Sequence, residues 1–231
     1  MSGIYQEILN RDRLKVYKSL SDFRDHGYLA GGTALALQLN HRKSVDFDVF
    51  IEKPISNVFK QNVKRTFGQV DYYVNTSDQI SFKTKENVEV TFVWYYFKPL
   101  FPLIKTDSLS LASIDDIAAD KAHTIARRAV WRDYVDIFCL LKDRHTTLDK
   151  IIGLAKKKFA GEFNEALFLQ QVTYYSDMIE SPIEFIKQAY SASEIKSFLK
   201  DVTKEYLQRI STQELKQNQG QKPHHSRGRH R

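Results

Sequence analysis

The amino-acid sequence predicts an α+β fold, in which a small mixed sheet with helices is followed by an α-helical C-terminal half. Two patterns predict this division. Short runs of alternating apolar residues, typical of strands, recur within residues 28–96. Apolar residues spaced three and four apart, typical of helices, continue through residues 113–215. We therefore divide the chain into an α/β core, a helical domain that completes the site, and a basic tail, over residues 1–110, 111–215 and 216–231.

The elements of the first half follow from their apolar patterns and their end signals. Gly27 is placed to cap a first helix, and Pro54 suits the first turn of a later one. The last three strands are spaced as an antiparallel meander. The predicted elements are a helix at 4–25, a strand at 28–30, a helix at 34–39, a strand at 46–51, a helix at 54–66, and strands at 70–74, 79–84 and 88–96.

The second half is predicted to be helical almost throughout. Ser113 followed by Asp115 and Asp116 has the pattern of a helix N-cap with acid in its first turn. The run Lys156 to Lys158 is typical of a solvated helix face; the alternative is a role in docking an RNA backbone. Further helices are expected at 132–143, 147–160, 164–178, 182–190 and 192–214.

Composition excludes several classes of protein. The chain has 231 residues, of which 42% are hydrophobic, as in an ordinary globular protein. The single cysteine, Cys139, allows no internal disulfide and no cysteine zinc site, which fits a cytoplasmic protein. No run approaches the roughly 20 apolar residues of a membrane helix, and the N-terminus has no signal-peptide pattern. We therefore expect no membrane partner.

The formal net charge of +7 is concentrated at the C-terminus. Residues 216–231 contain five basic residues and no acidic ones, so the rest of the chain carries only +2. Without apolar residues this tail cannot bury a core and is predicted to be disordered. It is either a flexible arm for RNA phosphates or a solvated terminus, and we favour the latter because it has no aromatic residue to stack on a base.

The most informative segment combines two glycines with two carboxylates. Side chains alternate along a strand, so Asp46 and Asp48 project from one face, about 7 Å apart. Two such carboxylates repel each other and need a cation, for which Mg²⁺ is the natural choice and Mn²⁺ a substitute. Gly31 and Gly32 allow a sharp turn, and Thr33 stands where a helix N-terminus would hold a phosphate.

Each part of this segment also has a structural interpretation. A lone Asp-x-Asp is usually a solvated strand face, and a lone Gly-Gly pair is usually a turn. The order of strand, Gly-Gly-Thr, helix, basic residues and Asp-x-Asp strand is far more specific. We therefore interpret the combination as a metal and phosphate site.

A second cluster lies on the helices that follow. Lys121, Thr124 and Arg128 share one helical face, from which Lys121 could contact nucleotide phosphates. Asp136 stands among apolar neighbours and needs a partner, for which Lys121 is attractive, although an exposed ion pair with Arg132 is also possible. Two nearby residues have structural interpretations: Asp133 is a salt bridge or cap, and His41 is a packed or solvated histidine.

Two blocks of sequence resemble a known family. They are LAGGTALAL with HRKSVDFDVF at residues 29–50, and DKAHT, Arg127 and RDYVDI at residues 120–137. The blocks resemble the AbiEii toxin family of nucleotidyltransferases, in the DNA polymerase β-like superfamily. With the strands between them they span about residues 28–142, and they occur in the family's order.

The resemblance implies transfer of a nucleoside monophosphate from an NTP to a hydroxyl, for which we expect the 3′ end of a tRNA. It implies catalytic roles for Asp46, Asp48, Lys121 and Asp136. Glu89 is either a third metal ligand beside Asp46 and Asp48 or a surface residue, and Asp136 or Glu89 would orient or deprotonate the acceptor. The residues that we assign to binding of the nucleotide and its phosphates are Gly31, Gly32, Thr33, Arg42, Ser44 and Lys121.

The resemblance also implies a biological role, as a toxin of a bacterial toxin–antitoxin or phage-defence system with a separate antitoxin protein as partner. Two alternatives remain open. One is the same chemistry on a small molecule or a protein hydroxyl, because the motifs specify the nucleotide better than the acceptor. The other is a non-catalytic nucleotide- or RNA-binding module, against which the crowded carboxylates argue.

Overall fold

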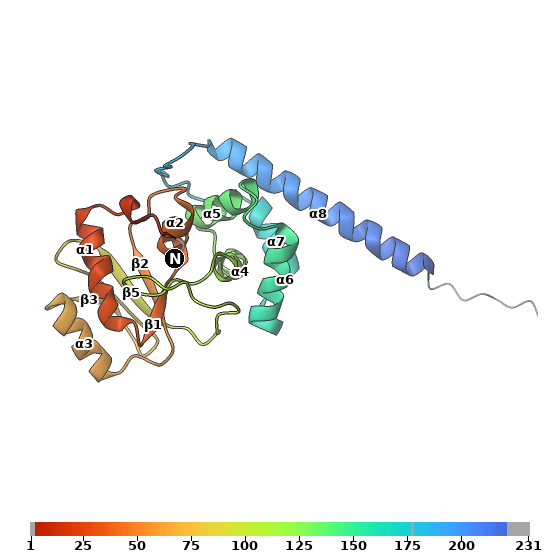
Figure 1. Cartoon of the computed structure of the whole chain (residues 1–231). Helices are drawn as coiled ribbons and strands as arrows, with labels where there is room; N and C mark the ends of the chain where they lie inside the picture. The colour runs from red at the N-terminus through yellow and green to blue at the C-terminus, as the bar shows by residue number, and fades with distance from the viewer. Residues whose placement is uncertain (1–2, 177, 221–231) are drawn as a thin grey trace, which may run out of the picture.

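The computed structural model describes residues 3–176 and 178–220. Its first half is a five-stranded mixed sheet with helices, and its second half is helical, as predicted (Figure 1). The strand order is β1-β2-β5-β4-β3, in which β2 and β5 are parallel and the other neighbours antiparallel. The strands are β1 at Gly27–Ala30, β2 at Phe47–Ile51, β3 at Tyr72–Asn75, β4 at Gln79–Lys83 and β5 at Glu89–Trp94.

The two faces of the sheet differ in chemistry. Phe47 and Val49 of β2 are paired in register with Val90 and Phe92 of β5, and all four side chains are buried on one face. Aromatic rings of the N-terminal helices pack there, with Phe23 and Phe59 each against Phe92. Because side chains alternate along a strand, Asp48 and Thr91 project from the opposite, polar face.

The predicted first helix, residues 4–25, is interrupted. The side chain of Asn10 accepts a hydrogen bond from the Arg13 N–H and caps a new helix, which ends the preceding turn. Gly27 is not a helix cap but the first residue of β1, where an added Cβ would lie 2.1 Å from the Phe50 carbonyl oxygen. The observed helices are η1 at Gln6–Ile8, α1 at Arg11–Ser19 and η2 at Leu20–Phe23.

The next two helices begin at different residues than predicted. Helix α2 at Gly31–Leu39 includes both glycines, which lie before the predicted start. Helix α3 at Asn57–Phe67 is capped by the Ser56 side chain, so Pro54 precedes the helix instead of forming its first turn. Both differences concern helix ends, where local capping groups decide the boundary.

The second half contains most of the predicted helices. Ser113 caps α4 as predicted, through its hydroxyl and the Asp116 N–H. The predicted helix at 182–190 is wrong, because this segment is extended and its backbone bonds to that of residues 41–43 (Lys43 N to Glu184 O, 2.8 Å; Ile186 N to His41 O, 3.1 Å). The helices are α4 at Ile114–Ile125, α5 at Trp131–Lys142, α6 at Leu148–Phe159, η3 at Ala160–Glu162, α7 at Glu165–Thr173 and α8 at Ala192–Gly220.

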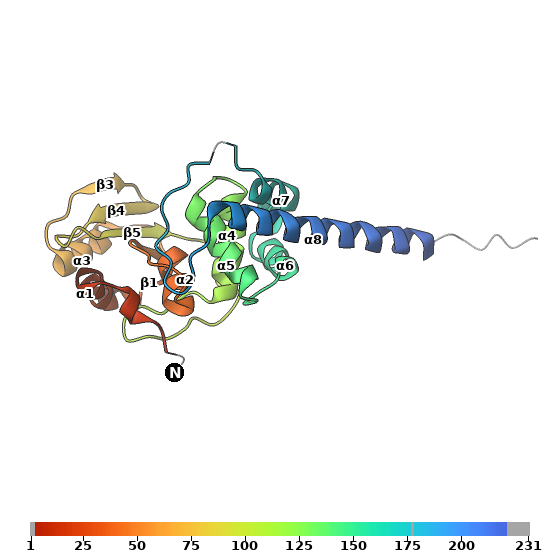
Figure 2. The same cartoon turned by 90° about the horizontal axis from the view of Figure 1, so that it is seen from above.

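Helix α8 packs on the other helices at its start and then projects far beyond them (Figures 1 and 2). It continues to Gly220, so the first five residues of the predicted tail are helical and not disordered. Residues 221–231, the rest of that tail, lie outside the described residues. Across residues 3–176 and 178–220, the helices are all too short or too polar to span a bilayer.

One lysine of the predicted solvated run is buried. Lys158 of α6 lies 3.2 Å from Asp116 Oδ1 and 2.8 Å from Asp120 Oδ1, both on α4, whereas Lys157 is exposed. The prediction of a solvated face was therefore wrong for Lys158. Its charge is compensated by two carboxylates that the linear sequence places about 40 residues away.

Candidate active site

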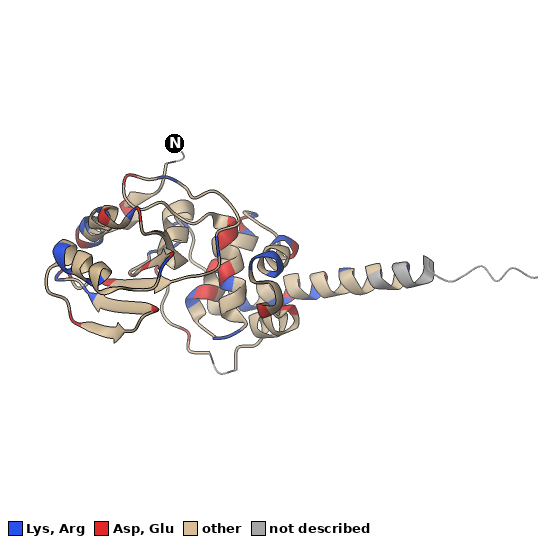
Figure 3. Cartoon of the chain, turned by 90° about the horizontal axis from the view of Figure 1, so that it is seen from below, with Lys and Arg blue, Asp and Glu red and all other residues tan. Residues whose placement is uncertain are grey.

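A pocket of about 530 Å³ lies between the polar face of the sheet and the α4–α5 helices. Charged residues of both signs gather in this part of the molecule (Figure 3). The lining brings together most of the predicted site residues, from segments up to about 100 positions apart. Those that line it include Gly31, Gly32, Arg42, Ser44, Asp46, Asp48, Glu89, Thr91, Asp120, Lys121, Thr124, Arg128, Arg132 and Asp133.

The carboxylate pair lies at the start of β2. Asp48 faces the pocket from the strand, and Asp46 directly precedes the strand. Burial and the neighbouring Asp46 carboxylate raise the pKa of Asp48 to about 6. Within the described part of the chain, no hydrogen bond or ion pair reaches the Asp48 carboxylate, while Asp46 is held by Arg132 at 3.1 Å. The pair therefore carries negative charge that the neighbouring side chains do not fully compensate.

Gly31 makes the close approach of Asp48 possible. Its φ of +65° is in the left-handed region, and a Cβ there would lie 2.6 Å from Asp48 Oδ2. A Cβ on Gly32 would lie 2.6 Å from Arg42 Nη2. The absence of a Cβ at each glycine therefore leaves space for a side chain of the site, Asp48 beside Gly31 and Arg42 beside Gly32.

Thr33 is placed differently from the predicted phosphate ligand. Its hydroxyl is buried, hydrogen-bonded to the Asp46 carbonyl oxygen and 2.8 Å from Ser44 Oγ. It is absent from the residues that line the pocket, whereas Ser44 lines it. These contacts tie the start of α2 to the segment that carries Asp46, so the hydroxyl positions the carboxylate segment.

Asp136 is the centre of a buried ion network. Arg42 donates from Nε to Oδ1 at 2.7 Å and from Nη2 to Oδ2 at 2.8 Å, and His41 Nε2 lies 2.8 Å from Oδ1. Lys121 Nζ lies 2.6 Å from Oδ2, which is the partner that the sequence suggested. Burial opposes ionisation, but Arg42 and Lys121 hold the pKa of Asp136 well below its usual range. A carboxylate so fully engaged does not suit a general base.

Lys121 combines burial with two acidic partners. Its Nζ contacts Asp133 Oδ1 at 2.8 Å in addition to Asp136. Burial alone would lower the pKa of Lys121, but Asp133 and Asp136 raise it, so the ammonium stays charged. Lys121 also lines the pocket, where Asp133 and Asp136 compensate its charge.

Glu89 lies on the same polar face of the sheet as Asp48. It is the first residue of β5, two before Thr91, which is the register partner of Asp48. It lines the pocket. Among residues 3–176 and 178–220, no three His, Cys, Asp or Glu side chains converge to hold a metal ion. The Asp46–Asp48 pair has hard carboxylate oxygens and excess negative charge, which fit a divalent cation such as Mg²⁺.

The structure adds two arginines to the site that the sequence analysis did not assign to it. Arg132 pairs with Asp46 at 3.1 Å, whereas the partners of Asp136 are His41, Arg42 and Lys121. Arg128 lines the pocket, and in the described chain it makes no ion pair with an acidic residue. The sequence predicted Arg128 on one helical face with Lys121 and Thr124, but α4 ends at Ile125, so Arg128 reaches the pocket from the segment after the helix.

Comparisons with known proteins agree with this architecture. The profile of the family described as "Nucleotidyl transferase AbiEii toxin, Type IV TA system" matches residues 14–70 and 59–224, which include both halves of the site. An uncharacterized protein of Aquifex aeolicus (strain VF5) is 30% identical over 202 residues, which cover 86% of this chain and 96% of that protein.

Two solved structures share the fold. JHP933 from Helicobacter pylori has a TM-score of 0.54 at 17% identity, over 95% of this chain and 100% of that one. MenT4, a nucleotidyltransferase toxin of Mycobacterium tuberculosis H37Rv, has a TM-score of 0.56 at 13% identity, over 84% of each chain. The family match over both sequence blocks, on a fold seen in these structures, shows that this chain belongs to the AbiEii toxin family and is a nucleotidyltransferase.

Proposed function

We propose that this enzyme transfers a nucleoside monophosphate from an NTP to the 3′ end of a tRNA in a Mg²⁺-dependent reaction. The observation that carries the proposal is the Asp46–Asp48 pair, which faces Lys121 and Arg128 across one pocket. Negative and positive walls of this kind suit a metal-bound triphosphate. We place the enzyme in the cytoplasm as a toxin of a toxin–antitoxin or phage-defence system, with an antitoxin protein as partner.

The chain's own residues divide the work of the reaction. Asp46 and Asp48 would hold the divalent cation, which would neutralise charge on the triphosphate when bound. Lys121 and Arg128 would attract the β- and γ-phosphates and stabilise the departing pyrophosphate. Gly31, Gly32 and Ser44 would form the wall against which the phosphates lie. Arg42, Thr33 and Asp136 act as positioning residues.

The acceptor step needs a group that orients a hydroxyl. In this step the acceptor oxygen forms a bond to the α-phosphorus, and the bond from that phosphorus to the pyrophosphate oxygen breaks. The proton of the hydroxyl must be accepted by a nearby base. Because Asp136 is engaged by Arg42, Lys121 and His41, Glu89 is the better candidate for that base.

The reaction is tested with total tRNA, Mg²⁺ and each α-³²P-labelled NTP in turn. We expect label on tRNA with the wild type and none with Asp46→Ala. The matched control is Asp78→Ala, an exposed acidic residue of the β3–β4 turn, which should label as the wild type does. Label on protein or small molecules alone would replace tRNA as the acceptor. Nucleotide binding without any transfer would favour the non-catalytic module.

The metal assignment is tested separately, by thermal unfolding. In the absence of divalent cations, Asp48→Asn should raise the melting temperature by about 5 °C, because it removes a partly buried carboxylate from a repulsive pair. Mg²⁺ or Mn²⁺ should then stabilise the wild type but leave Asp48→Asn unchanged. Equal stabilisation of both proteins would show that Asp48 does not hold the cation.

The toxin role is tested by induced expression in a bacterial host. Wild-type protein should arrest growth, and Asp46→Ala at equal protein levels should not. Growth arrest that persists with Asp46→Ala would separate toxicity from nucleotidyl transfer.

A further inference from the structure

Three lysines of α8 form a stripe along the helix. Lys196, Lys200 and Lys204 are spaced four residues apart, so they fall within a sector of about 80°. Acidic residues of the same stretch lie at least about 60° from the nearest of these lysines on the helical wheel. They are Glu194, Asp201 and Glu205. The helix therefore segregates its charges instead of interleaving them.

The outer lysines of this stripe make few internal contacts: Lys200 Nζ lies 5.5 Å from the ring centre of Tyr175. Lys200 and Lys204 are exposed, and the described residues offer neither of them an ion pair. Lys196 is partly buried, paired with Glu180, and its Nζ lies 5.9 Å from the ring centre of Trp131. Solvated lysines are ordinary on a protein of this charge. A functional interpretation of the stripe therefore depends on where it lies relative to the active-site pocket.

The stripe begins beside the start of α5, next to residues that line the active-site pocket. Trp131, on which Lys196 rests, stands between Val130 and Arg132, which both line the pocket. Arg128 lines the pocket as well. From Lys196, which pairs with Glu180, the stripe continues to Lys200 and Lys204 along α8, which leads away from the sheet (Figure 2).

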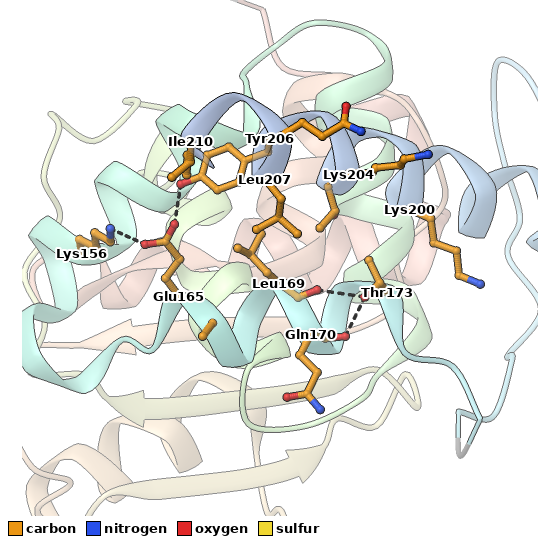
Figure 4. Close-up of a pocket in the computed structure, with 13 residues that line it drawn as sticks. Lys156, Glu165, Leu169, Gln170, Thr173, Lys200, Lys204, Tyr206, Leu207 and Ile210 are labelled. Carbon is orange, nitrogen blue, oxygen red and sulfur yellow. Dashed lines mark hydrogen bonds and ion pairs between the residues drawn. The ribbon is translucent and has the colours of Figure 1, made fainter. Parts of the chain in front are cut away.

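A groove of about 1020 Å³ accompanies the outer lysines. It lies between α7 and α8, and Lys200 and Lys204 stand at the end opposite the Lys156–Glu165 ion pair (Figure 4). Leu169 and the half-exposed Leu207 face each other in it. A cationic rim over an apolar floor suits a ligand that combines anionic groups with flat apolar ones, as a nucleic-acid strand does.

We propose that Lys196, Lys200 and Lys204 form a track for the sugar–phosphate backbone of the acceptor RNA, whose end occupies the active-site pocket. The inference rests on the proposed function, which requires such an acceptor. Lysines four residues apart on a helix are about 6 Å apart along its axis, close to the spacing of successive phosphates in one strand. The negative charge of an RNA backbone is complementary to the lysines of the track. The flat apolar faces of its bases are complementary to the apolar floor of the groove beside it.

The track is tested by measuring tRNA binding over a range of salt concentrations. The variant is Lys200→Gln/Lys204→Gln, which removes two exposed charges without touching the pocket. We expect about tenfold weaker binding at 0.1 M salt, and a slope of log K against log salt that is smaller by about 2. In transfer assays, KM for tRNA should rise while kcat and the affinity for NTP stay unchanged.

The matched control is Lys53→Gln/Lys64→Gln, which removes two exposed lysines at and near α3, on the far side of the sheet from α8 (Figure 1). Equal tRNA binding by the two double variants would overturn the track. So would a changed oligomeric state of the α8 variant in sedimentation with unchanged RNA affinity, because the groove would then be an interface between copies.

The test separates the track from the proposed function. Lysine-dependent tRNA binding by a wild-type protein that transfers no nucleotide would support the track and reject the reaction. If the Lys200→Gln/Lys204→Gln variant transfers nucleotide to tRNA with the same KM as the wild type, the reaction is supported and the track is rejected. Absence of tRNA binding by the wild type would reject both.

Discussion

At the turn between β1 and α2, one position requires glycine, both for its backbone conformation and for the space beside it. Gly31→Ala should cost about 1–3 kcal/mol of stability, because its φ is +65°. The new Cβ would also displace Asp48, whose Oδ2 would lie 2.6 Å away, so activity should fall by about 10²-fold or more. Denaturant unfolding and transfer kinetics measure the two effects.

A second glycine provides the control. Gly153 of α6 has no atom within 4 Å of an added Cβ, so Gly153→Ala should stabilise the helix by up to about 1 kcal/mol and leave activity unchanged. Equal behaviour of the two alanine variants would contradict the role of Gly31.

The buried charge of Asp136 should appear in the acid dependence of stability. Its pKa is lowered in the folded state, so its contribution is present at neutral pH and is lost as the pH falls below about 4. Asp136→Asn should destabilise the protein at pH 7 by about 3–5 kcal/mol, because it leaves Arg42 buried without its carboxylate partner and Lys121 with Asp133 alone. Urea unfolding at several pH values should show this difference shrinking in acid; a difference independent of pH would refute the assignment.

At the scale of elements, the packing of α6 on α4 includes the ion pairs of one buried lysine. Lys158→Met should destabilise the protein by about 3–5 kcal/mol, because Asp116 and Asp120 would remain buried without a cation. The neighbouring Lys157 is exposed, so Lys157→Met should change stability by no more than about 0.5 kcal/mol. Chemical denaturation of both variants measures the contrast, and similar losses would show that the ion pairs to α4 contribute little.

The elements also show where sequence patterns succeed and fail. Alternation identified β2, β4 and β5, because one face of each strand is buried and the other lines the pocket. Helical spacing at residues 182–190 was misleading, because backbone bonds to residues 41–43 replaced those of a helix. Tertiary contacts can override helix propensity in this way when the backbone of another segment forms hydrogen bonds with the same residues.

At the scale of the whole molecule, the two halves share one core. A single buried cluster extends from Ile8 to Tyr206, and the Arg42–Asp136 and Lys121–Asp136 pairs link the two halves. We retain a boundary near residue 110 as a proposal about topology, but expect both parts to unfold together. Calorimetry should show one transition with equal van't Hoff and calorimetric enthalpies. Two separate transitions would show that the halves are independent domains.

The sequence by itself determined the α+β order, the family and the carboxylate pair, because strand alternation and the Gly-Gly-Thr to Asp-x-Asp spacing are local properties. It also indicated the Lys121–Asp136 pair. Only the tertiary structure decided how the charges are shared. Arg42 and His41 engage Asp136, Arg132 turns to Asp46, Lys158 is buried, and Arg128 remains unpaired among the described residues. Such pairings join residues up to about 95 positions apart, so they depend on how the elements pack and not on any local pattern.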